Sequence, residues 1–262
     1  MRTYYQFALL SFRRSFSYKA EYIFGMINSI LVIFAGVAIW TAVYGDQSVV
    51  LGISKEQAVT YSILAFILRS WYSMDEFIID NKLKSGEIAA DLLKPIYFPF
   101  YLFSVIFGET AFQFITKVLP TVAVSALIFR FQPPADIING CMFLFSLIMS
   151  YLLMFLTNYL FWLMAFWVYS TWSLITIKNA VILLLSGATI PLWFLPKPLK
   201  VWIELLPFKG IYFTPISIYL DEMTPKRMAY TFLEQAVWIV VLYFAGACLW
   251  KRAQKHLVIQ GG

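Results

Sequence analysis

The chain alternates between long apolar stretches and short polar ones. Six apolar stretches approach or exceed about 20 residues, the length that an α-helix needs to cross the hydrocarbon core of a bilayer. They cover residues 22–44, 57–79, 108–129, 137–167, 174–195 and 230–250. The pattern predicts an all-α integral membrane protein with six transmembrane helices and both ends of the chain on the same side.

The first residues, 1–20, are too polar for a span and have the periodicity of an amphipathic helix. One apolar stripe contains Tyr5, Leu9, Phe12 and Phe16, and two basic residues, Arg13 and Arg14, lie beside it. We expect this helix to lie in the membrane interface, with its basic residues near anionic headgroups. A role as a simple membrane anchor accounts for the pattern.

Polar side chains interrupt two of the predicted spans. In the second span, Arg69, Tyr72 and Glu76 fall on one helical face, which favours a salt-bridged face near the inner end; contact with cargo is the alternative. In the fourth span, Asn158 is the most polar interior residue. A hydrogen bond to a neighbouring helix is the expectation for Asn158.

The third predicted span carries a polar stripe. Glu109, Gln113 and Lys117 recur at intervals of four residues, and Pro120 is expected to kink the helix beyond them. Residues 97–107, which precede this span, are expected to lie along the interface. The stripe either packs against a polar face of another helix or lines a path, and the sequence does not decide between them.

A polar stretch, residues 80–95, separates the second span from the third. Its second half predicts a short helix: Ser85 is a candidate N-cap, Glu87 suits the positive end of the helix dipole, and Pro95 ends the helix. Such a short helix is not stable alone in water, so it needs a surface to lie against. We expect that surface to belong to another protein.

The predicted short helix is amphipathic. Ile88 and Leu92 share one side, with Leu93 beside them, while Glu87, Asp91 and Lys94 are expected to be solvated. The apolar side is therefore the predicted docking side.

Two segments resemble a known family. Residues 85–95 (SGEIAADLLKP) resemble the signature of ABC-2-type transporter permeases, and residues 185–192 (LSGATIPL), 194–196 (FLP) and 206–208 (LPF) are similar to the re-entrant outer region of the same family. The resemblance assigns coupling to an ATPase to Ser85, Gly86, Glu87, Ile88, Asp91, Leu92, Leu93 and Pro95. It assigns the outer re-entrant region to Ser186, Gly187, Pro191, Pro196 and Pro207.

The resemblance implies a function. The chain would be a single permease domain, residues 1–262, of a bacterial ABC exporter in the cell inner membrane, with cytoplasmic N- and C-termini. Its coupling helix would dock on a separate ABC ATP-binding subunit, which would bind ATP and Mg, and this chain would hold no cofactor. A second permease, identical or related, would complete the path, and the interfacial helix could also contact the ATPase. Short broken helices are expected in the outer loop, at 198–206 and 211–220 within 196–228.

Composition supports the membrane assignment. Apolar residues make up 61% of the chain and charged residues 13%, which is too apolar for a soluble domain. The net charge of +6 does not indicate nucleic acid, because basic residues of membrane chains mark inner loops, and no nucleic-acid motif occurs. Lysine and arginine are more numerous in the segments that cytoplasmic termini would place inside.

Catalytic motifs are missing from the sequence. No phosphate-binding G-x-x-x-x-G-K-[ST], H-E-x-x-H, C-x-x-C or G-x-S-x-G is present, and the single histidine, His256, follows basic residues near the end. The two cysteines, Cys141 and Cys248, are predicted to be small buried side chains, without a metal. A transport subunit that is not an enzyme fits these observations. An ion-coupled transporter or channel is the alternative, supported by Arg69, Glu109 and Lys117, and a membrane-embedded enzyme would need a polar catalytic cluster that is not evident.

Overall fold

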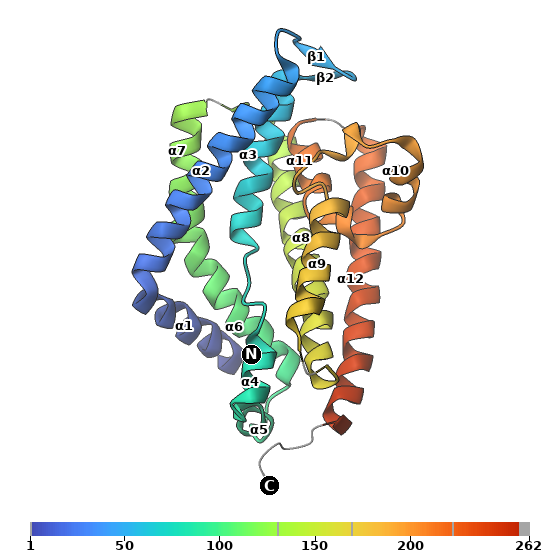
Figure 1. The fold of residues 1–262 in the computed structure, drawn as a ribbon. Coiled ribbons are helices and arrows are strands. Elements are labelled where there is room, and N and C mark those ends of the chain that lie inside the picture. Colours follow the sequence, from blue (N-terminus) through green and yellow to red (C-terminus); the bar gives the residue numbers. More distant parts are fainter. Residues whose placement is uncertain (1, 130, 169, 222, 257–262) are drawn as a thin grey trace.

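A computed structural model describes residues 2–129, 131–168, 170–221 and 223–256, and these form a bundle of helices (Figure 1). The first half contains α1 (Arg2–Ser15), η1 (Phe16–Tyr18), α2 (Lys19–Tyr44), β1 (Val49–Val50), β2 (Ile53–Ser54), α3 (Lys55–Trp71), α4 (Ile78–Lys84), α5 (Glu87–Leu92), α6 (Phe98–Gln113), the π-helical turn η2 (Phe114–Val118) and α7 (Leu119–Phe129). The second half contains α8 (Ile137–Leu163), η3 (Met164–Phe166), α9 (Trp172–Leu185), η4 (Leu192–Phe194), α10 (Lys197–Glu204), η5 (Pro207–Gly210), α11 (Phe213–Tyr219), α12 (Pro225–Ala253) and η6 (Gln254–His256).

Four helical units are long and apolar enough to cross a membrane. They are Tyr22–Tyr44, Phe98–Phe129, Ile137–Phe166 and Pro225–His256. They overlap four of the six predicted spans, so the chain is an all-α, multi-pass membrane protein. The other two predicted spans coincide with shorter helices, α3 with 17 residues and α9 with 14.

Both of these shorter helices end earlier than predicted. The second predicted span, 57–79, ends as α3 at Trp71, and the non-helical segment that follows contains Asp75, whose carboxylate accepts a hydrogen bond from the backbone N–H of Phe77 (2.9 Å). A short side chain that bonds the nearby backbone competes with helix formation. The fifth, 174–195, ends as α9 at Leu185, because Gly187 takes a left-handed conformation (φ 81°).

The third predicted helix begins earlier than expected. It starts at Phe98, with Pro99 in its first turn, so residues 97–107 lead into and form the span and do not form a separate interfacial segment. Pro120 was expected to kink this helix. The irregularity in the structure is a π-helical turn, Phe114–Val118, which lies just before the proline. Proline has no N–H to donate to the carbonyl four residues earlier, and its ring clashes with that carbonyl, so the preceding turn widens.

The two ends of the bundle differ in character (Figure 1). The short helices α4 and α5 lie at the same end as the beginning of α1 and the end of α12, while the β1–β2 hairpin and α10 lie at the opposite end.

Local sequence sets several helix starts: Ser54 and Gln57 form a capping box at α3, and Asp136 caps α8.

The N-terminal helix packs against α6 through its serines and through part of the predicted stripe: the ring centroids of Phe12 and Phe16 lie 5.3 and 4.7 Å from that of Phe112. Its buried residues are Ser11 and Ser15, whereas Tyr5 is 69% exposed and Phe16 is 48% exposed. The small serines permit a close approach, and at Gly108 of α6 an added Cβ would lie 2.1 Å from the carbonyl oxygen of Ala8. Part of the apolar stripe therefore remains free to contact lipid.

Candidate functional site

The polar stretch between the second and third predicted spans folds into a helical hairpin of α4 and α5. The turn between them depends on Gly86, whose φ of 76° lies in the left-handed region. Ser85 is the C-cap of α4, and Gly86 is the N-cap of α5. The prediction of Ser85 as N-cap is therefore wrong, although its Oγ lies 3.4 Å from the backbone nitrogen of Glu87.

Asp91 holds this hairpin together from inside. Its side chain is 6% exposed, and its two carboxylate oxygens accept hydrogen bonds from Lys82 Nζ (2.6 Å) and Lys94 Nζ (2.6 Å). Both ammonium groups also lie over the ring of Tyr101, at 5.8 and 5.3 Å from its centroid. Asp91 was predicted to be solvated, and it is buried because two cations reach it from either side. We call Lys82, Asp91 and Lys94 the Asp91 clamp.

The charge state of the clamp follows from its geometry. Burial alone would raise the pKa of Asp91, but the hydrogen bonds and charges of Lys82 and Lys94 outweigh it and leave that pKa below its usual value. The carboxylate is therefore ionised at neutral pH and acts as a fixed counterion for both lysines.

The two sides of α5 differ in burial. Ile88 is 4% exposed and belongs to the main core, and Leu92 packs against that core, so the apolar side that was predicted to dock on another protein faces the interior of this chain. Leu93, predicted to accompany them, is 87% exposed. The exposed residues form what we call the docking surface: Ser85, Gly86, Glu87, Ala90, Leu93 and Pro95. Its centre is a leucine without cover in this chain, and the other members are small or polar residues and one proline.

The N-terminal helix is linked to this region. The backbone N–H of Tyr97, just after the hairpin, donates to the hydroxyl of Tyr4 on α1 (3.0 Å). Arg13 and Arg14 lie in the last turn of the same helix and are exposed. A displacement of the hairpin can therefore reach α1 through a direct hydrogen bond.

Two helices and the non-helical segment before α4 meet at a buried lysine. Lys178 of α9 is 2% exposed; its Nζ donates to Asn158 Oδ1 of α8 (2.7 Å) and to Glu76 Oε1 (3.2 Å) in the segment before α4. Asn179 donates to the other oxygen of Glu76 (3.0 Å). Asn158 thus makes the predicted contact to another helix, but its partner is a charged group. From the sequence alone, Lys178 could be recognised only as a lysine inside an apolar run.

The predicted face of Arg69, Tyr72 and Glu76 does not form. The helix ends at Trp71, so Glu76 is not on the helix of Arg69; Arg69 is exposed, and Tyr72 is buried against Ser150. Asp80 pairs with Lys84 (2.7 Å). Glu76 takes part in an ion pair, as expected, but with Lys178 of another helix.

The polar stripe of the third predicted span contacts three different segments. Glu109 accepts a hydrogen bond from Ser11 of α1 (3.2 Å), and Gln113 donates to the carbonyl of Ser73 (3.1 Å). Lys117 lies next to Gly25 of α2, where an added Cβ would be 3.3 Å from its Cε. Of the two roles left open by the sequence, these contacts correspond to packing against polar neighbours.

The predicted outer re-entrant region forms a tight bend against α3 and α11. Gly187 accepts a hydrogen bond at its carbonyl from Tyr61 (2.8 Å), and the carbonyl of Ser186 accepts one from Phe213 N–H (3.0 Å). Pro191 precedes η4, and Pro196 caps α10. The predicted short helices are present as α10 and α11, each beginning or ending within two residues of the predicted bounds.

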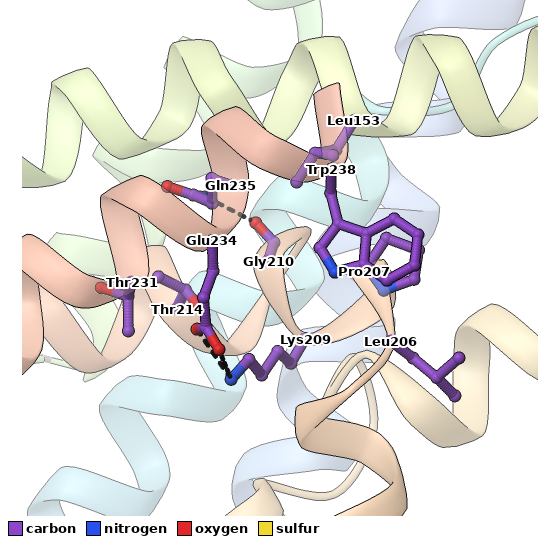
Figure 2. A pocket seen from close by; sticks show the side chains of 10 residues that line it. All are labelled: Leu153, Leu206, Pro207, Lys209, Gly210, Thr214, Thr231, Glu234, Gln235 and Trp238. Carbon is purple, nitrogen blue, oxygen red and sulfur yellow. Dashed lines mark hydrogen bonds and ion pairs between the residues drawn. The ribbon is translucent and has the colours of Figure 1, made fainter. Parts of the chain in front are cut away.

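Pro207 lines a small, mostly apolar cavity between η5 and α12 (Figure 2). Lys209 pairs with Glu234 (2.8 Å), and Gln235 donates to the carbonyl of Gly210 (2.8 Å). The cavity measures about 10 Å³, room for no more than one water molecule. The cavity lies between the loop residues near Pro207 and the last helix, α12, and it is too small for cargo.

Sites for a metal or a disulfide are not evident in the part of the chain that the structure describes. No group of three or more potential ligands occurs among those residues. Cys141 and Cys248 are free and exposed, which contradicts the expectation that both are buried, because each lies on an outward face of its helix.

Comparison with known proteins gave one match. A family model described as ABC-2 family transporter protein matches residues 23–261, most of the chain and all the elements from α2 onward. Searches of curated proteins and of solved structures gave no match.

Proposed function

The chain belongs to the ABC-2 family of transporter proteins, a family of non-catalytic membrane permeases of ABC transporters, and from this premise we propose that it is the permease of an exporter driven by a separate ATP-binding subunit. ATP and Mg would be bound in that partner, since this sequence carries no phosphate-binding motif.

The observation that carries the proposal is the α4–α5 hairpin. A helix of six residues has little stability of its own, yet the Asp91 clamp and the burial of Ile88 hold it in place. The same arrangement leaves Leu93 exposed outside the segments that cross the membrane. An uncovered leucine surrounded by small residues and two polar ones is suited to a small pocket on a soluble protein.

We propose six membrane crossings. In addition to the four long units, α3 and α9 would cross, although their helical lengths are only about 25 and 21 Å. Each is continued by irregular backbone, residues 72–77 and 186–191, whose buried residues are Tyr72 and Met74 in the first segment and Ser186, Gly187, Ala188 and Pro191 in the second. Non-helical backbone at membrane depth is tolerated where protein shields it. Both termini would then lie with α5 on the cytoplasmic side of the inner membrane.

A second permease, identical or related, would complete the transport path. The described residues form a water-sized cavity beside Lys209 and an apolar groove between α6, α8 and α12. Neither of these two crosses the molecule. Only 17% of the residues in the apolar stretch of α2 are buried within the chain. This leaves a face of α2 for lipid or for another permease.

The proposed mechanism is mechanical. Closure of two ATPase subunits on ATP would push the docking surface, and the Asp91 clamp would transmit the force because α4 and α5 move as one unit. From there the movement can follow two described contacts: Tyr97 to Tyr4 of α1, and Glu76 to Lys178 of α9. The helices of the two permeases would then separate on the outer side.

Substitution of the exposed leucine tests the proposal. The variant Leu93→Glu should keep its fold because the side chain is 87% exposed, but should lose association with the ATPase and transport-coupled ATP hydrolysis. The matched control is Leu51→Glu at the hairpin on the opposite end, where the leucine is 76% exposed. Co-purification and ATPase activity of the reconstituted complex would be measured for both.

The outcomes separate the possible functions. Loss of association in Leu93→Glu with normal behaviour of Leu51→Glu supports coupling through α5. Cargo movement that needs an ion gradient and no ATPase would instead support the ion-coupled alternative, for which the buried Glu76–Lys178 pair is the structural argument.

A further inference from the structure

An apolar groove runs between α6, α8 and α12. Its volume is about 270 Å³, larger than the cavity of about 150 Å³ that holds benzene in an engineered protein. The walls include Phe103, Phe155 and Phe244, and the polar side chains that reach it are the tyrosines Tyr97, Tyr159 and Tyr243.

The groove lies in the half of these helices nearest the α4–α5 hairpin. Tyr97 is three residues beyond Lys94 of the Asp91 clamp, and Ala247, at the other wall, is one and a half turns from the end of α12. These helices cross the membrane, so the groove opens toward lipid in one leaflet.

One wall carries a buried polar atom without a partner. The hydroxyl of Tyr159, a residue 3% exposed, has no hydrogen-bond partner among the described residues. Its ring packs against Gly246 of α12, where an added Cβ would lie 3.0 Å from the ring, and stacks on Phe155. A buried hydroxyl without a partner is unfavourable, so a small shift of the Tyr159 ring that brings its hydroxyl to an oxygen atom of an occupant would be favoured.

A basic residue continues the groove face of α12. Val240, Phe244 and Ala247 line the groove, and Lys251 follows at the next position of the same i, i+4, i+7 series. Lys251 is exposed, in the last turn of α12. The groove thus ends at a positive charge at the level where lipid headgroups begin.

We propose that this groove binds one acyl chain of an anionic phospholipid, with the ester region near Tyr159 and the headgroup on Lys251. The assignment to the cytoplasmic leaflet rests on the proposed orientation, but the site itself does not. An apolar wall suits the chain, the unpartnered hydroxyl suits an ester oxygen, and the lysine suits a phosphate.

A second copy of the chain fits the same face less well. A two-fold interface uses the same patch on both subunits, so a symmetric dimer through this groove would bring two Lys251 side chains toward each other. Like charges at such a contact oppose association, whereas an anionic headgroup neutralises one lysine.

Lipid retention by the purified full-length permease tests the proposal. The protein would be reconstituted in nanodiscs of equal amounts of phosphatidylglycerol and phosphatidylcholine, released, and examined by native mass spectrometry. We expect retained phosphatidylglycerol in the wild type and its loss in Ala247→Trp, whose indole would fill the groove. In Lys251→Gln the preference for phosphatidylglycerol should fall about fivefold, as removal of one basic contact implies.

The control is Lys226→Gln, which removes an exposed lysine at the opposite end of α12 and should leave retention and preference unchanged. Equal retention of both lipids by the wild type, or unaltered retention by Ala247→Trp, would overturn the proposal. So would a change of oligomeric state in Ala247→Trp without a change in lipid, which would make the groove an interface between copies. None of these readouts depends on ATP hydrolysis, so failure here is separate from failure of the coupling proposal.

Discussion

Lys82 Nζ on α4 lies 2.6 Å from Asp91 Oδ2 on α5, so an ion pair closes the turn that Gly86 opens. Lys82 is 17% exposed and Asp91 6%, whereas Lys94, the other partner of Asp91, is 44% exposed. The inner pair is therefore screened less by solvent than the outer pair, and the three residues should contribute unequally.

Replacement of the clamp residues should give a graded loss of stability. Asp91→Asn leaves the mostly buried Lys82 with only the more distant and exposed Glu87 (3.8 Å) as a counterion and should lower the free energy of unfolding by about 1–2 kcal/mol. Lys94→Gln removes a half-exposed partner and should cost about 0–1 kcal/mol. Thermal unfolding of the purified permease measures both. Equal effects of the two substitutions would contradict the assignment of Lys82–Asp91 as the main contact.

The clamp should also lose its effect in acid. Because the pKa of Asp91 is lower in the folded protein than its usual value, the stabilisation is complete above the unfolded pKa of about 3.9 and disappears as pH falls through the folded pKa. The stability difference between wild type and Asp91→Asn should thus be constant from about pH 8 to 5 and shrink below about pH 4. Unfolding curves of both proteins across this range give the difference directly. A difference that already shrinks between about pH 7 and 5 would mean that another group is responsible.

The apolar periodicity of the sequence located the helices better than it located their ends. The span at residues 22–44 was predictable because Ser29, the polar residue in it that bonds the local backbone, donates to the carbonyl of Gly25 within the same helix (2.8 Å) and does not interrupt it. The end of α3 was not predictable, since the non-helical segment after Trp71 is held by bonds such as that from Phe77 N–H to Asp75, and an apolar count ignores such bonds.

Side-chain partners were harder to predict than helices. Asp91 has the amphipathic position of a solvated residue, and only the fold of α4 onto α5 brings Lys82 to it. Lys178 is similar: its partners, Asn158 and Glu76, are distant in sequence, so the pairing follows from tertiary structure alone. Ion pairs of this kind are not encoded in a local pattern.

The buried pair of Glu76 and Lys178 should respond unequally to loss of either partner. Glu76→Gln leaves the ammonium of Lys178, which is 2% exposed, without a counterion and should destabilise the protein by about 2–4 kcal/mol. Lys178→Met keeps the side-chain length, and Glu76, 33% exposed, can be hydrated, so the cost should be about 1 kcal/mol.

Thermal unfolding in the same detergent measures the two variants. The double variant Glu76→Gln with Lys178→Met completes a mutant cycle and should be more stable than Glu76→Gln alone. If Glu76→Gln proved the milder single change, the lysine would have to be hydrated in the folded protein, contrary to its burial.

The packing of α1 on α6 should depend on one glycine. An added Cβ at Gly108 would lie 2.1 Å from the carbonyl oxygen of Ala8, and backbone cannot yield as a flexible side chain can. Gly108→Ala should therefore destabilise the protein by about 1–3 kcal/mol through displacement of α1, even though alanine favours helix. The matched control is Gly140→Ala in α8, where the nearest atom, in Pro134, would be 3.7 Å away; it should be neutral or stabilising by up to about 1 kcal/mol. Thermal unfolding of both variants, with proteolysis of the N-terminal segment as a local probe, distinguishes them. Equal stability of the two variants would show that α1 does not lie as closely on α6 as Gly108 and Ala8 indicate.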